Sequence, residues 1–311
     1  MFTIRRVNPD LAENLEPLGS KRKFWYREPA AGGVGADTRL LFKAEERGTG
    51  EDWAEKIACE LAGLLGLPHV HYELAVEIGS EKPGVVCASC VVDPVALVLG
   101  NQILLALDKE YPANNGRKFK VSAHTVEAVS VAVGLLLPPP MQWMRAAPEG
   151  ITTALDVFTG YVLLDAWTAN QDRHHENWGV LWDGKTLALA PTFDHGAAMA
   201  RNLSDEERKE RLTTKDGNRQ VPYFAAKARS AFFADVVASR PMTTYAAWRA
   251  FAALAPGAAT AWRTRLAAID SPTVQAVLEE VPPNRMTAVC REFTMALLAE
   301  NRRRILADIH E

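Results

Sequence analysis

The sequence predicts an α+β protein in two parts: a small part with an antiparallel sheet and one main helix, then a larger and mostly helical part. Three observations support this class. Up to about residue 100, strand-like runs separated by turn residues surround one helical segment. Their order, with two strands on either side of the helix, favours an antiparallel sheet that the helix covers. From about residue 120, apolar residues recur at helical spacing around one hairpin signal. We therefore divide the chain into residues 1–100 and 101–311.

Composition narrows the function classes without choosing one. The 311 residues suit one bilobed domain or two small ones, and 48% hydrophobic with 23% charged residues excludes wholesale disorder. A net charge of −3 lacks the basic excess of a general nucleic-acid binder. The N-terminus has no secretory apolar region, and no apolar run is long enough to span a bilayer. We expect a cytoplasmic protein that binds neither nucleic acid nor membrane.

Four strands are expected in the small part, around one helix. They are Lys23–Arg27, Arg39–Ala44, His71–Ile78 and Gly84–Val92. The helix has a capping-box pattern from Thr49 to Asp52 at its start and a stop at Gly66. Glu55 shares a helix face with small residues and is expected to point into the protein, although Glu51 shares that face and remains an alternative.

Cys87 and Cys90 form a C-x-x-C pattern within the last of these strands. A structural zinc site needs four ligands, and the sequence offers no second C-x-x-C and no matching histidine pair. Two residues three apart on a strand point to opposite faces. Both cysteines are therefore predicted to be small buried residues of the core.

The larger part begins with a helix at 153–168 and a polar cluster from Asn170 to Asn177. A hairpin follows, with Asp183-Gly184 as a two-residue turn, so Trp182 should face Lys185 and Asn177 should face Ala190. The C-terminal third has helical spacing with breaks near Pro256, Pro272 and Pro282. The hairpin should bring Asn177 and Asp194 to one open end, close to Asp172.

Convergent Asp, Asn and Asp oxygens are ligands that suit magnesium rather than zinc. The spacing from Asp172 to Asn177 equals that of the protein-kinase catalytic loop, and Asp194 lies where the metal-binding Asp of such enzymes lies. Upstream, Lys43 on a strand precedes Glu55 on the next helix, which is the order of the kinase lysine and its glutamate. An ion pair between them would hold Lys43 for the nucleotide phosphates.

These motifs resemble the HipA-like serine/threonine kinase family, which is related to protein kinases and phosphoinositide kinases. The resemblance covers about residues 15 to 305 and implies a bilobed protein-kinase-like fold. The segments that carry it are Asn170–Asn177, Leu189–Asp194, Asn301–Ile305, Gly19–Tyr26 and Asp52–Glu55. Full-length HipA toxins begin with an extra N-terminal subdomain, so this chain is expected to be a compact form. His195 adds a residue to the D-F-G pattern, so no switching by a mobile Phe is implied.

The resemblance also implies a role for each matched residue. Asp172 would be the catalytic base, Asn177 and Asp194 the magnesium ligands, and Lys43 the nucleotide lysine paired with Glu55. Arg173 and His174 would support the catalytic loop, while His175 is expected to be exposed. The nucleotide phosphates would be covered by a loop that contains Gly19, Ser20, Lys21 and Lys23, and the adenine hinge would follow Val92. Ser20 would be a site of autophosphorylation.

The predicted function is an ATP- and Mg²⁺-dependent kinase that transfers the γ-phosphate to a Ser or Thr hydroxyl of a protein, including itself. Two alternatives stay open: a small-molecule or lipid kinase, and a catalytically weak nucleotide-binding module of a toxin–antitoxin pair. Expected partners are ATP, a protein substrate and an antitoxin-like protein.

Overall fold

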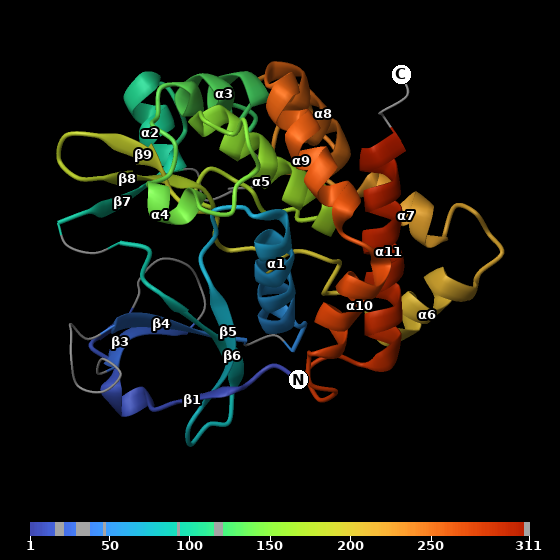
Figure 1. The fold of residues 1–311 in the computed structure, drawn as a ribbon. Helices are drawn as coiled ribbons and strands as arrows, with labels where there is room; N and C mark the ends of the chain where they lie inside the picture. The colour runs from blue at the N-terminus through green and yellow to red at the C-terminus, as the bar shows by residue number, and fades with distance from the viewer. Residues whose placement is uncertain (16–21, 29–37, 46–47, 92–93, 115–120, 308–311) are drawn as a thin grey trace.

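The computed structural model describes residues 1–15, 22–28, 38–45, 48–91, 94–114 and 121–307. It has the predicted α+β class and two lobes, a sheet with one main helix and a larger helical part (Figure 1). Gly19, Ser20, Lys21 and Val92 lie outside the described residues. Within the described part of the chain, no helix is both long and apolar enough to cross a membrane.

The small-lobe sheet has six strands in the order β1-β5-β6-β4-β3-β2. A short 3-10 turn at Pro9–Leu11 joins the first two strands. The strands are β1 (Arg5–Val7), β2 (Asn14–Leu15), β3 (Lys23–Glu28), β4 (Thr38–Ala44), β5 (Tyr72–Glu77) and β6 (Pro83–Ala88). The four predicted strands are therefore confirmed as β3, β4, β5 and β6.

Two features of this sheet differ from the prediction. β1 pairs in parallel with β5, so the sheet is mixed rather than purely antiparallel. β6 ends at Ala88, whereas a strand to residue 92 was expected. Cys90 therefore lies beyond the strand, and the two-residue alternation that would place it opposite Cys87 does not apply.

The predicted helix is α1 (Glu51–Leu65), and it ends at Gly66 in the left-handed conformation. The expected capping box is wrong. The helix begins after Gly50 without a side-chain cap, and the Glu45 carboxylate accepts the backbone N–H groups of Thr49 and Glu51 instead. The Thr49 hydroxyl accepts a hydrogen bond from Arg201. The Glu45 carboxylate, a few residues upstream, thus binds N–H groups that the side chain of the N-cap residue usually binds.

The large lobe holds a three-stranded sheet and ten helices among its described residues. The strands are β7 (Ala96–Leu99), β8 (Gly179–Trp182) and β9 (Leu187–Leu189), in the order β7-β8-β9. The helices are α2 (Gly100–Leu107), α3 (Val126–Gly134), α4 (Met141–Met144), α5 (Ala154–Thr168), α6 (Asp205–Thr213), α7 (Val221–Lys227), α8 (Thr244–Leu254), α9 (Pro256–Ala268), α10 (Ser271–Glu279) and α11 (Ala288–Ala307).

The hairpin exists, but its register differs from the prediction. Trp182 faces Leu187 and Val180 faces Leu189, so the loop has four residues, 183–186. Asp183 explains the difference, because its carboxylate accepts the N–H groups of Lys185 and Thr186 and the Thr186 hydroxyl. The shift of two residues preserves which face each side chain occupies.

One hydrophobic core joins the two lobes. Trp53, Ile57 and Leu61 of α1 are buried in the same cluster as Phe158 of α5 and Trp262 of α9. Figure 1 shows α1 standing between the small-lobe sheet and helices α10 and α11. The helix that carries Glu55 is therefore packed against both lobes. This packing fixes the position of α1 relative to each lobe.

Candidate active site

A cavity of about 400 Å³ is lined by both lobes. From the small lobe, β3 contributes Lys23 and β4 contributes Lys43. From the large lobe, Asp172 and Asn177 come from the loop after α5, and Asp194 comes from the segment after β9. Residues separated by as many as 171 positions thus face one hollow.

The structure brings most of the predicted site residues together. Lys23, Lys43, Asp172, His174, Asn177 and Asp194 all line this cavity. Glu55 lines an adjoining hollow with Lys43, Asp194 and Gly196. Arg173 is fully buried beneath the loop.

The loop from Asn170 to Asn177 is held by a buried ion pair. Arg173 binds both carboxylate oxygens of Asp165, through Nε at 2.7 Å and through a terminal nitrogen at 2.8 Å. The other terminal nitrogen donates to the carbonyl of Asn177 and to the hydroxyl of Thr192. Asn170 donates to Asp165 and accepts the N–H of Asp172. Such bidentate geometry fixes direction as well as distance.

His174 and Asn177 orient the two ends of the loop around Asp172. His174 Nδ1 accepts the N–H of Glu176, so the proton of its neutral ring lies on Nε2. That Nε2 lies 3.2 Å from Asp172 Oδ1. The amide nitrogen of Asn177 donates to the carbonyl of Asp172 at 2.7 Å, and this leaves the amide oxygen as an acceptor.

Lys43 forms an ion pair with Asp194, with Nζ 2.9 Å from Oδ1. Burial alone would lower the pKa of Lys43, but the carboxylates of Asp194 and Glu55 outweigh it and raise that pKa. The ammonium is therefore charged at neutral pH. It also lies 5.5 Å from the ring centre of Tyr72.

Glu55 does not pair with Lys43 in the way the sequence suggested. Its two carboxylate oxygens accept the backbone N–H groups of His195 and Gly196, at 2.7 and 3.1 Å. These bonds hold the backbone directly after Asp194. Glu55 is therefore a positioning residue in this structure, and Lys43 is held by Asp194 instead.

Asp194 itself adopts a left-handed conformation, with φ of 61°. This costs a non-glycine residue roughly 1–2 kcal/mol, although Asp is among the residues that tolerate it. The two bonds from Glu55 hold the following residues in the geometry that this conformation requires. Local strain held by surrounding contacts is typical of functional positions.

Sequence reasoning missed three buried residues that support the site: Asp165, Thr192 and His195. Thr192 links Arg173 to His195, whose Nε2 lies 2.8 Å from the threonine hydroxyl. Asp165 lies on α5, five residues before Asn170, and its acidic side chain in an otherwise apolar stretch was the available signal. No pattern in the sequence around Thr192 and His195 indicated that they support the site.

Two expectations about single residues are wrong. His175 was expected to be exposed but is fully buried, with Nδ1 2.9 Å from the Tyr111 hydroxyl. Cys87 and Cys90 were expected on opposite faces, yet both line the cavity, because the chain leaves β6 before Cys90. The segment from Ala88 to Val91 forms part of the cavity wall.

Searches with the sequence found no matching family model and no matching curated protein. Solved structures do match. The crystal structure of the Helicobacter pylori proinflammatory kinase CtkA superposes with a TM-score of 0.67 at 17% identity, covering 97% of this chain and 96% of that one. HipA of Shewanella oneidensis, solved with HipB and operator DNA, matches with a TM-score of 0.55 at 13% identity, covering 96% of this chain and 68% of HipA. The fold is that of the HipA-like kinases.

A HipA-like kinase fold confirms the resemblance predicted from the sequence motifs. At these identities the likeness concerns the fold, and the chemistry of this chain has to be argued from its own residues. The donor set in the cavity fits magnesium. The Asp194 carboxylate and the Asn177 amide oxygen are hard ligands of the kind that magnesium prefers, and both line this cavity.

Proposed function

We propose that the protein is an ATP- and Mg²⁺-dependent kinase that phosphorylates a Ser or Thr hydroxyl. One observation carries the proposal: Lys43, Asp172, Asn177 and Asp194 line the same cavity. Phosphoryl transfer requires a cation for the phosphates, oxygen ligands for the metal and an acceptor for the hydroxyl proton. These four side chains supply all three.

Each residue has a separate task in this mechanism. Asp172, whose Oδ1 lies 3.2 Å from His174 Nε2, accepts the proton of the attacking hydroxyl. Lys43 binds phosphate oxygens and offsets their negative charge. Asn177 and Asp194 would hold magnesium, which neutralises charge that develops on the transferred phosphate. Preorganised charges of this kind each contribute a few kcal/mol of transition-state stabilisation.

The ion pair between Lys43 and Asp194 is consistent with this scheme. When a metal–nucleotide complex binds, each group would exchange the other for a new partner. The Lys43 ammonium would pair with a phosphate, and the Asp194 carboxylate would pair with the metal cation. Binding would then replace one ion pair by two. Glu55 keeps the backbone after Asp194 in place during this exchange.

The test uses labelled ATP and Mg²⁺ with three variants. Asp172→Asn and Asp194→Asn should reduce phosphate transfer, to the protein itself or to a lysate, by at least about a hundredfold. Asp235→Asn is the matched control, because it removes the same charge from an exposed turn outside the cavity. Equal transfer by wild type and both cavity variants would show that the assignment is wrong.

A protein acceptor is proposed on the family resemblance, and a small-molecule acceptor is the alternative. Phosphoproteomics of cells that express wild type or Asp172→Asn should show Ser or Thr sites that depend on Asp172. Label confined to a small-molecule fraction would favour the alternative. ATP binding without any transfer would instead indicate a nucleotide-binding module.

Two further proposals rest on the resemblance alone. Autophosphorylation at Ser20 should add one phosphate by intact mass, and Ser20→Ala should remove it while Ser80→Ala does not. The Shewanella structure contains HipB together with HipA. For this chain an antitoxin-like protein partner is proposed, which would co-purify with it and suppress phosphate transfer.

A further inference from the structure

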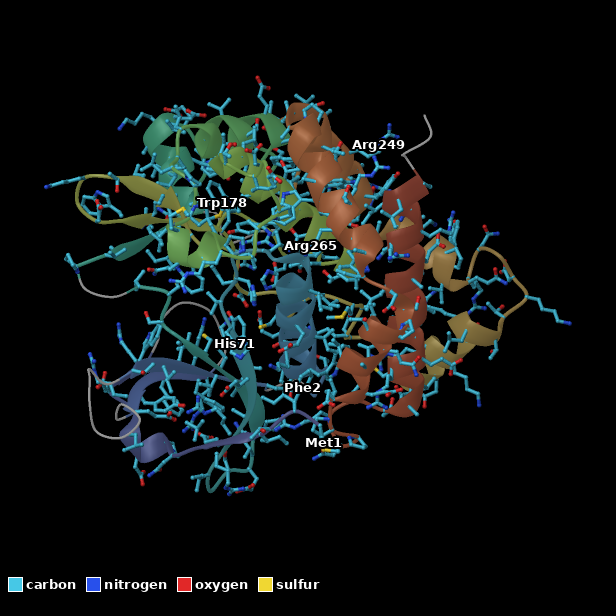
Figure 2. The ribbon with its side chains drawn as sticks, viewed as in Figure 1. Met1, Phe2, His71, Trp178, Arg249 and Arg265 are labelled. Carbon is cyan, nitrogen blue, oxygen red and sulfur yellow. The ribbon has the colours of Figure 1, made fainter. Side chains whose placement is uncertain are left out.

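Three side chains outside the cavity bring metal-ligating atoms close together. Cys59 on α1, His69 in the connection after α1, and His71 directly before β5 each offer one such atom, and all three atoms lie within 4.8 Å of one another. Cys59 Sγ lies 3.7 Å from His71 Nδ1. Figure 2 shows His71 at the end of β5 that lies beside α1. Among the described residues, this group contains no carboxylate, unlike the acidic clusters that often occur on protein surfaces without a metal.

The spacing agrees with zinc coordination. Zn²⁺ binds sulfur at about 2.3 Å and histidine nitrogen at about 2.0 Å, so a tetrahedral ion separates the two atoms by about 3.6 Å. The observed separation between Cys59 Sγ and His71 Nδ1 is close to this value. One thiolate and two imidazoles are ligands that zinc and similar transition metals prefer over magnesium.

The surroundings hold two of the ligands in suitable orientations. His69 Nδ1 lies 2.7 Å from the carbonyl of Leu67, so this nitrogen carries the proton and Nε2 remains as the ligand atom. Nε2 faces α1, since a Cβ at Gly63, one turn after Cys59, would lie 3.8 Å from it. The N–H of Tyr72 donates to Cys59 Sγ at 3.3 Å, which fixes the position of the sulfur and opposes in part the burial that raises the pKa of this thiol.

We propose that Cys59, His69 and His71 bind one Zn²⁺ ion, with water in the fourth position. Cys59 is buried, His69 is half-buried and His71 is exposed, so the ion can enter from solvent on the side of His71. Binding displaces the thiol proton of Cys59 to solvent. The site is independent of the proposed kinase activity, and it uses none of the residues that line the nucleotide cavity.

The position of the site gives the ion a structural effect. Cys59 lies one helical turn after Glu55 on α1. The connection that carries His69 pairs with the segment before Asp194, through Val70 to Thr192 and Thr192 to Pro68. Zinc would therefore tie the helix that holds the Asp194 backbone to the chain that leads into Asp194, and it should stabilise this junction.

The experiment measures zinc binding by the full chain after removal of metals. Zn²⁺ is titrated against a chromophoric chelator, and wild type should bind one equivalent with a dissociation constant of about 1 µM or lower. Cys59→Ser and His71→Asn should each weaken zinc binding at least about tenfold. Removal of a group that only hydrogen-bonds to a metal ligand already has an effect of about that size, and these substitutions remove a ligand itself. Cys90→Ser removes a different thiol and should bind as wild type does.

Two further readouts separate this site from adventitious binding. Co²⁺ in place of Zn²⁺ should give the thiolate charge-transfer absorption of a sulfur-ligated tetrahedral ion, absent from Cys59→Ser. One equivalent of Zn²⁺ should raise the melting temperature of wild type but not of His71→Asn, an exposed position where folding is not at risk. The proposal is overturned if wild type and His71→Asn bind zinc alike, or if cobalt shows no sulfur ligation. The Cys59–His71 contact would then be a thiol–imidazole hydrogen bond.

Discussion

Arg173 fixes the loop that carries Asp172 and Asn177, because it binds groups before, within and after that loop. Its guanidinium joins α5 at Asp165, the carbonyl of Asn177 and the hydroxyl of Thr192. A buried charge of this kind needs every one of these partners, since an unpaired buried ion costs several kcal/mol. The planar fork of Arg meets this need, and the single ammonium of Lys cannot.

Arg173→Lys should therefore damage the site although the charge is kept. We expect a loss of about 1–3 kcal/mol of unfolding free energy, from hydrogen bonds that are no longer made, and at least a tenfold fall in phosphate transfer. Urea unfolding and labelled ATP measure the two effects. Arg303→Lys is the matched control, an exposed arginine paired with Glu300 one turn away, and it should change stability by less than about 1 kcal/mol. Equal effects of the two substitutions would contradict this role of Arg173.

His124 makes stability depend on pH. It is buried, with Nδ1 3.0 Å from the carbonyl of Ala231 and Nε2 accepting from the indole of Trp178 at 3.2 Å. Burial lowers its pKa to about 3, and the nearby rings of His175 and His174 act in the same direction. In the unfolded chain its pKa is near 6.5, so below that pH the unfolded state gains a proton that the native state does not.

The contribution of His124 is fully present above about pH 6.5 and is lost as the pH falls toward 3. Between pH 7 and pH 5 the loss should be about 2 kcal/mol. Urea unfolding at both pH values measures it, and His124→Gln should reduce the difference by this amount while keeping an acceptor for Trp178 and a donor for Ala231. Identical pH dependence in wild type and His124→Gln would refute the expectation.

At the level of single residues, the groups that do chemistry could be predicted and their supports could not. The spacing of Asp172 and Asn177, and the chain order of Lys43 and Glu55, are local patterns that reaction chemistry constrains. Glu55 could bind either a lysine or backbone N–H groups, and only tertiary placement decided that it binds those of His195 and Gly196. The cavity wall at Cys90 was likewise hidden, because the end of β6 has no strong turn signal.

Among the elements, α1 is held at its N-terminal end by two arginines of the large lobe. Arg201 binds Glu51 and Thr49 at its start, and Arg285, between α10 and α11, binds Asp52 and the carbonyl of Ala75 on β5. Asp52 and Arg285 are both buried, and burial raises the pKa of Asp52 against the opposing effect of Arg285. The pair thus ties α1 and the small-lobe sheet to the C-terminal helices.

Breaking this pair from one side should be costly. Arg285→Met leaves a buried carboxylate without its partner and should lower the free energy of unfolding by about 3–5 kcal/mol. Asp52→Asn combined with Arg285→Met should be less destabilising than the sum of the single variants by at least about 1 kcal/mol, because the uncompensated charge is gone. Arg219→Met, which breaks an exposed pair with Glu210, should cost less than about 1 kcal/mol. Additive effects at positions 52 and 285 would argue against the pair.

Helix and turn boundaries were predicted well where a few neighbouring residues determine them. They were predicted poorly where a side chain binds backbone N–H groups in place of the expected turn or cap. The prolines near 256 and 272 begin α9 and α10, as expected of residues without an N–H to donate. Asp183-Gly184 predicted a two-residue turn between β8 and β9. The Asp183 carboxylate instead accepts the N–H groups of Lys185 and Thr186, and the loop is longer than predicted. At the start of α1, Glu45 replaced the expected cap in the same way.

At the scale of the whole molecule, the cavity depends on how the two lobes meet. Lys43 and Asp194 come from different lobes, and the 2.9 Å contact between them exists only when the lobes are packed together. Ligands that bridge such a cavity stabilise the native arrangement, because they bind the folded state and not the unfolded chain. The charged side chains that the proposed phosphoryl transfer uses all line this cavity. Such a local set of charges is consistent with a net charge of only −3.

MgATP should therefore raise the melting temperature of the whole chain, and the metal should be required for most of the effect. At a ligand concentration 100 times the dissociation constant, the stabilisation is about 2.7 kcal/mol, which for a chain of this size shifts the melting temperature by roughly 5 °C. EDTA should remove most of this shift, and so should Asp194→Asn, since both remove the link between phosphate and carboxylate. The exposed substitution Asp235→Asn should leave it intact. A shift of the same size for ATP with EDTA and for MgATP would mean that Asn177 and Asp194 hold no metal, and the nucleotide would then be bound through Lys43 and the cavity wall alone.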